Sequence, residues 1–74
     1  MRAVYVPTRV MPAGVVRLEA TAPAVEGSGG MLTLYPADRP EPRRTPLTPA
    51  QLRGLLRQWA QGVQAGEGRL HIGD

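Results

Sequence analysis

The first half of the chain alternates runs of strand-forming residues with turn residues. β-Branched and aromatic residues over 3–10 predict a first strand, and Pro7 within it predicts an edge position or a bulge, because proline cannot donate to a ladder. A second run over 15–22 alternates apolar and polar residues, and a third run follows over 31–35. Turns rich in proline and glycine separate the runs, so we predict an antiparallel β-meander over 1–35.

The second half begins with an extended segment and continues with a helical pattern. Four prolines in 36–47 predict an Arg- and Pro-rich connector in an extended conformation. Thr48 and Gln51 then have the spacing of a capping box, which predicts the start of a helix. Apolar residues with helical spacing follow at Leu52, Leu55, Leu56, Trp59, Ala60 and Val63. We predict a helix over 48–66 and a short strand over 69–72.

Together these elements predict a single small α+β domain over 1–74 with the element order βββαβ. In this fold a three-stranded antiparallel meander carries one amphipathic helix on one face, and a short C-terminal strand joins the sheet. We expect the helix to cover Val16, Leu18, Leu32, Leu34, Leu70 and Ile72, together with Val4 and Val6. The opposite, open face should then carry Tyr5, Arg17, Glu19, Thr21, Thr33, Tyr35 and His71.

Composition excludes most kinds of catalytic site. The chain has no cysteine, so it has neither a disulfide nor a thiolate nucleophile, and its one histidine and one serine stand in no catalytic pattern. One histidine without cysteine also cannot make a structural zinc site. We therefore expect no catalytic residues, no metal, no cofactor and no small-molecule substrate.

The hydropathy of the chain bears on its cellular compartment, and its basic residues bear on the gene that encodes it. No stretch approaches the roughly 20 apolar residues that cross a membrane, so we expect a cytoplasmic protein without a membrane partner. All nine basic residues are arginine and none is lysine, which is typical of a GC-rich gene. The small size fits an inhibitor or adaptor encoded by a phage or another mobile element.

Protein binding is the function that the predicted surfaces favour. An open sheet face and an exposed edge strand are both surfaces that another chain can use, and tyrosine and arginine often anchor interfaces. The partner would be another protein or a second copy of this chain, as a homodimer. The predicted interaction residues are Tyr5, Arg17, Thr33, Tyr35 and His71.

Nucleic-acid binding is the alternative. Residues 36–57 hold five arginines and two acids, which concentrates positive charge on the connector and the first half of the helix. This predicted basic ridge, which would meet phosphates or an acidic partner, consists of Arg39, Arg43, Arg44, Arg53 and Arg57. Tyr5 and Tyr35 could then stack on bases. A solvated surface whose arginines reflect only codon usage remains a third interpretation.

Overall fold

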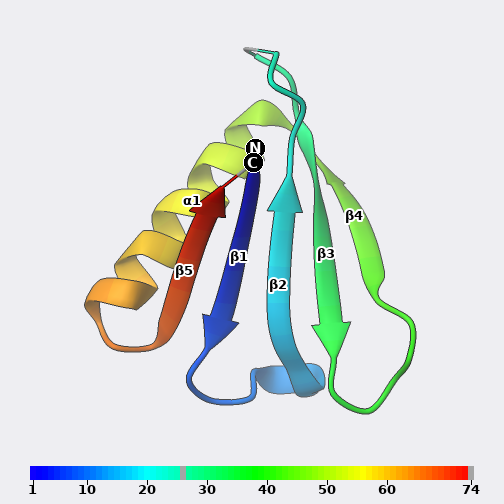
Figure 1. Ribbon diagram of the computed structural model, residues 1–74, viewed down its shortest axis with the longest axis vertical. Coiled ribbons are helices and arrows are strands. Elements are labelled where there is room, and N and C mark those ends of the chain that lie inside the picture. Colours follow the sequence, from blue (N-terminus) through cyan, green and yellow to red (C-terminus); the bar gives the residue numbers. More distant parts are fainter. Residues whose placement is uncertain (26, 74) are drawn as a thin grey trace.

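The computed structural model describes residues 1–25 and 27–73, and within them five strands form one antiparallel sheet with a single α-helix on one face (Figure 1). The spatial order of the strands is β4-β3-β2-β1-β5. The elements are β1 (Arg2–Pro7), the 3-10 helix η1 (Pro12–Gly14), β2 (Val15–Thr21), β3 (Gly30–Pro36), β4 (Arg43–Leu47), α1 (Pro49–Gln64) and β5 (Gly68–Gly73). The predicted α+β class is confirmed.

The start of α1 has the predicted capping box. The Gln51 N–H donates to the Thr48 hydroxyl at 3.1 Å, and the Thr48 N–H donates to the Gln51 side-chain oxygen at 2.9 Å. These bonds satisfy two backbone groups that have no partner inside the helix. At the other end, Gly66 adopts a φ of 74° and turns the chain toward β5.

The predicted connector over 36–47 is a connector only in its first part. Its last five residues form β4, which pairs with β3 and is one edge of the sheet. Pro46 is compatible with this place because an edge strand needs only alternate N–H groups for its single neighbour. The strand has no apolar–polar alternation, so the pattern of the sequence did not indicate it.

The first strand differs from prediction in both position and orientation. β1 lies between β2 and β5 rather than at an edge. Pro7 is its last residue, beyond the end of the pairing with β2 at Tyr5. Cross-strand partners share a face of the sheet, and Tyr5 pairs with Leu18 while Val4 pairs with Glu19. Tyr5 therefore faces the helix, and the placement of Val4 and Val6 under the helix is wrong.

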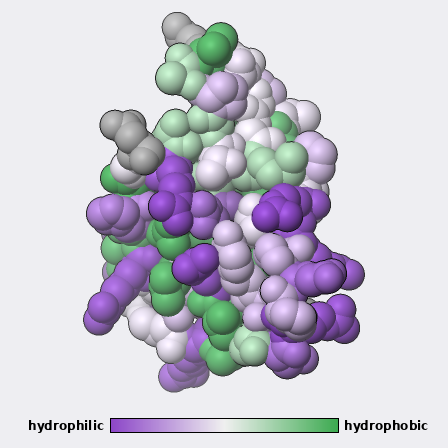
Figure 2. Space-filling view, turned by 45° about the vertical axis from the view of Figure 1, so that its right-hand side comes forward, coloured by the Kyte–Doolittle hydropathy of each residue, from purple (hydrophilic) through white to green (hydrophobic). Residues whose placement is uncertain are grey.

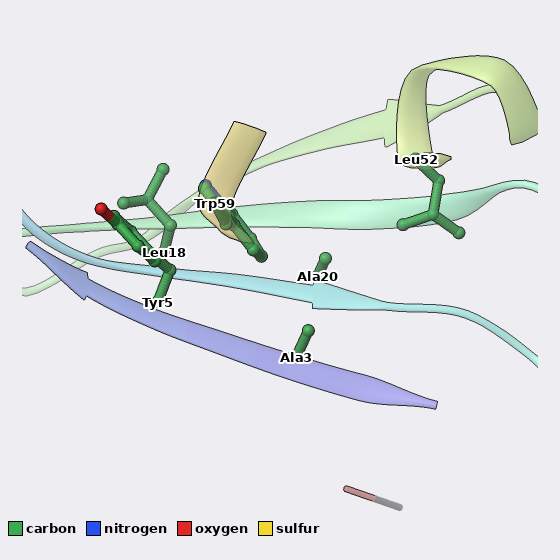
Figure 3. Packing of buried hydrophobic residues seen from close by; sticks show 6 residues of the cluster. All are labelled: Ala3, Tyr5, Leu18, Ala20, Leu52 and Trp59. Carbon is green, nitrogen blue, oxygen red and sulfur yellow. The ribbon is translucent and has the colours of Figure 1, made fainter. Parts of the chain in front are cut away.

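Small residues and two aromatic rings form the centre of the core (Figure 3). Ala3 and Ala20 are fully buried, and they leave room for α1 to approach the sheet at Leu52. The rings of Tyr5 and Trp59 stack with centroids 5.6 Å apart and planes 7° apart, which joins β1 to the helix.

Two other apolar positions depart from the predicted core. The register between β2 and β3 shifts between Val15 and Arg17, so that Val15 rather than Val16 packs against the core. Ile72 shares the helix side of the sheet with Ala3 but remains 56% exposed. Leu32, Leu34 and Leu70 pack against the core as predicted.

Candidate functional site

The face of the sheet opposite α1 is covered by no described element (Figure 1). One row of side chains crosses all five strands on this open face, in the order His71, Val4, Glu19, Thr33 and Arg44. Because side chains along a strand alternate between the two faces, residues two positions apart in the same strand lie on the same face. The open face therefore includes Arg2, Val6, Arg17, Thr21, Met31, Tyr35, Pro46 and Arg69.

A hydrogen-bonded network surrounds Glu19 at the middle of the open face. Arg2 donates from Nε to Oε1 at 2.6 Å and from Nη2 to Oε2 at 3.3 Å. The Tyr35 hydroxyl donates to the same Oε2 at 3.3 Å. The hydrogen bond from Arg2, helped by its charge, lowers the pKa of Glu19 and raises the pKa of Arg2. The Glu19 carboxylate, in a residue that is 9% exposed, is thus already satisfied within the chain.

The aromatic ring on this face is also engaged. The guanidinium carbon of Arg17 lies 4.0 Å from the centroid of the Tyr35 ring, which is a cation–π contact. Tyr35 is therefore held by Glu19 at its hydroxyl and covered by Arg17 over its ring. The contact fixes the orientation of both side chains and leaves little of this ring face for a flat ligand.

The exposed charge of the open face is basic. Arg17, Arg44 and Arg69 are exposed, and Arg2 keeps 54% of its side chain exposed despite its ion pair. Among the described residues of this face, Glu19 is the only acid. Figure 2 views the molecule with the β4 side turned forward, and hydrophilic side chains there flank a strip of more hydrophobic surface. The face thus combines arginines with apolar positions.

The structure brings together most of the predicted interaction residues. Arg17, Tyr35 and His71 lie on the open face as expected, whereas Thr33 does so but is almost completely buried. Tyr5 does not belong to this surface, because it is 7% exposed and stacks on Trp59. The placement of Tyr5 on the open face is wrong.

The predicted basic ridge is not one surface. Arg43 and Arg44 are consecutive residues of β4, so they point to opposite faces of the sheet. Arg53 and Arg57 are exposed on α1, on the other side of the sheet from Arg44. Arg39 lies in the loop before β4, where Asp38 and Glu41 line the same hollow as Arg39 and Arg43.

Two basic residues of the open face were missing from the predicted site. Arg69 could have been found, since it alternates with His71 on the same short strand. Arg2 could not, because apolar residues occupy both faces of β1 and the sequence alone does not reveal which of them is covered.

Within residues 1–25 and 27–73, no group of three or more histidine, aspartate and glutamate side chains could hold a metal ion. None of the helical residues there forms a segment long and apolar enough to cross a membrane. Comparison of the chain with protein-family models, curated proteins and solved structures found no match.

Proposed function

We propose that the protein is a non-enzymatic binding module whose open sheet face takes an acidic surface of another protein. The observation that carries this proposal is the charge of the uncovered face, where four arginines surround one carboxylate that is already bound within the chain. A cytoplasmic inhibitor or adaptor, such as mobile elements encode, fits a module of this size.

The apolar positions between the arginines favour a protein over a simple counter-ion. Val6 is 43% exposed, and Val4, Met31 and Pro46 share its face. Protein interfaces combine an apolar centre with arginine and tyrosine, and they deplete lysine. Arg17 and Tyr35 are already oriented by their contact, so less conformational entropy is lost when a partner binds.

Nucleic acid is the second candidate, and the same four arginines favour it. Sequence-tolerant binding of single strands also uses aromatic rings on which bases stack. Tyr5 is in the core, and Arg17 covers the ring of Tyr35 at 4.0 Å. The open face therefore offers phosphate contacts, but Arg17 already occupies one face of its tyrosine ring, which makes the protein partner the better supported of the two.

Paired neutral variants test the proposal. Arg17→Gln with Arg44→Gln removes two charges from the open face, and Arg53→Gln with Arg57→Gln removes two charges from the solvent side of α1. Immobilised wild type and both variants are incubated with lysate that has or has not been treated with nuclease, and the captured proteins are compared by mass spectrometry. We expect nuclease-resistant capture of an acidic protein by wild type and by the α1 pair, and its loss with the open-face pair.

The purified partner then gives a quantitative measurement. The open-face pair should weaken binding by roughly tenfold, mainly through slower association that depends on salt concentration. Equal capture by the two variant pairs would contradict the open-face site. Capture that disappears with nuclease would instead establish nucleic acid as the ligand, with a salt slope that falls by about one for each phosphate-contacting arginine removed.

A further inference from the structure

The two edges of the sheet differ in the backbone groups that they expose. The Thr8 N–H donates to the Glu67 carbonyl at 2.9 Å, and this pair continues the register of β1 with β5. Hydrogen-bonded pairs alternate along an antiparallel ladder, so Arg69 and His71 direct their backbone groups toward β1. Gly68, Leu70 and Ile72 therefore direct their N–H and C=O groups away from the sheet. Gly68 is buried beside Tyr5, so Leu70 and Ile72 form the accessible part of this edge.

The β4 edge is less open to another strand. The Ala22 N–H donates to the Met1 carbonyl at 3.0 Å, so Met1 and Ala22 are a hydrogen-bonded pair. When the alternation of hydrogen-bonded pairs is followed from this pair through β2 and β3 to β4, the backbone groups of Arg44 and Pro46 point away from the sheet. Pro46 has no N–H to offer, and proline on an edge strand hinders pairing with a further chain. β5 has neither a proline nor a register shift.

The side chains along β5 specify what kind of strand would fit beside it. On the open-face side lie Arg69 and His71, both exposed. On the helix side lie Leu70 and Ile72, and Ile72 is 56% exposed. A strand paired with β5 would place residues opposite Arg69 and His71 on the open-face side, and residues opposite Leu70 and Ile72 on the helix side.

We infer that β5 is a strand-addition site for an extended segment of a partner protein in which acidic and apolar residues alternate. The backbone groups of Leu70 and Ile72 supply the hydrogen bonds, as in other cases of β-augmentation. Arg69 selects acidic side chains on one side of the added strand. Ile72 contacts apolar side chains on the other. This site extends the proposed binding function to a second surface, and it does not depend on Arg17 or Arg44.

A second copy of the chain fits this edge less well than a single extended segment. Antiparallel pairing of two β5 strands about Leu70 would set Arg69 of each copy opposite His71 of the other, which brings basic residues together. It would also bring the two α1 helices toward each other, because α1 runs alongside β5 (Figure 1). An isolated peptide segment has neither disadvantage.

Synthetic peptides test the inference directly. The probe is acetyl-Val-Glu-Val-Glu-Val-Glu-Val-amide, and the control peptide has the same composition with its glutamates grouped at one end. We expect the alternating peptide to slow hydrogen exchange of the outward amides of Leu70 and Ile72. Binding measured by NMR titration should be roughly tenfold tighter for the alternating peptide than for the grouped one, because only alternation matches both sides of β5.

Two variants separate edge pairing from adsorption to a basic surface. Ile72→Pro removes an outward N–H without removing a bond to β1, and it should weaken binding roughly three- to tenfold, which is the effect of about one hydrogen bond and one lost side-chain contact. The matched control Ile72→Val keeps the N–H and should bind like wild type. Arg69→Glu should reverse the preference, so that the peptide with lysine in place of glutamate binds instead.

Three outcomes would overturn the inference. Equal binding of the two peptides, or unchanged binding by Ile72→Pro, would show that pairing at the edge is not the mode of contact. Protection of the same amides without peptide, increasing with protein concentration, would show that a second copy occupies the edge. Since the variants leave Arg17 and Arg44 in place, loss of peptide binding at β5 would not affect the test of the open face.

Discussion

Glu19 shows how one side chain organises the open face. Its carboxylate accepts hydrogen bonds from Arg2 and Tyr35, and Arg17 then lies over the ring of Tyr35. Three side chains from three strands are thus fixed through one acid. The alternation of apolar and polar residues in β2 predicted that Arg17 and Glu19 share a face, and Leu32 and Leu34 in the next strand predicted that Tyr35 lies on the same side. The partner on β1 was not predictable, since Arg2 precedes a run that is apolar on both faces.

The lowered pKa of Glu19 predicts a dependence of stability on pH. Above about pH 4.3, the ordinary value for glutamate in an unfolded chain, the ionised carboxylate stabilises the folded state. This contribution is lost as the pH falls through the lowered pKa of the folded protein. We expect Glu19→Gln to lower the free energy of unfolding by about 1 kcal/mol near neutral pH, and the difference from wild type to shrink on acidification.

Denaturant unfolding between about pH 3 and pH 7 measures this difference. Glu41→Gln, a change of an exposed loop acid, is the matched control and should be nearly silent at every pH. A constant difference between Glu19→Gln and wild type across the range would show that the ionised carboxylate does not contribute through its charge.

At the scale of the elements, structure that neighbouring residues specify was predicted correctly, whereas structure that depends on distant strands was not. The capping box of α1 lies within four consecutive residues, and its bonds formed as predicted. The orientation of β1 depends instead on which strands flank it, so that Tyr5 was placed on the wrong face. The strand β4 has no alternation and is specified by its pairing with β3. Non-local pairing decides these two elements, and no pattern within the strands themselves reveals it.

Contact between α1 and β1 predicts opposite effects at two glycines of the same helix. A Cβ atom at Gly62 would meet the Tyr5 hydroxyl, whereas one at Gly54 would meet nothing within 4 Å. Gly54→Ala should stabilise the protein by about 1 kcal/mol through helix propensity. Gly62→Ala should instead destabilise it by about 1 kcal/mol, because the overpacking outweighs the same gain.

Removing the hydroxyl should reduce the penalty. In a Tyr5→Phe background Gly62→Ala should destabilise the protein less, because the nearest atom to the new Cβ is then the ring carbon Cζ at 3.2 Å. Thermal unfolding of the four proteins in this cycle measures the coupling. If Gly62→Ala and Gly54→Ala were equally stabilising, the close approach of the helix to Tyr5 would be refuted.

At the scale of the whole molecule, the described residues form one helix that covers only part of a five-stranded sheet. The accessible surface is 5301 Å², whereas a compact monomer of this mass exposes roughly 4,450 Å². Because one helix covers only part of the sheet, the core is small and much of the sheet stays accessible. Both features favour a binding role. The sequence indicated the single helix and hence the open face, but β4 and the orientation of β1 determine its extent.

The pairing of Arg2 with Gly73 has a topological consequence, because it places the two ends of the described chain side by side (Figure 1). A short Gly-Ser linker could join the ends, and new termini could be opened in the loop 37–42 between β3 and β4. In such a circular permutant β5 and β1 would become a hairpin, and their pairing would change from the most distant in the sequence to one of the nearest. We expect the permutant to keep its cooperative unfolding and to fold faster than the natural order in stopped-flow refolding, since loop closure would then cost less entropy. A permutant opened between Leu18 and Glu19 should not fold, because that cut divides a central strand.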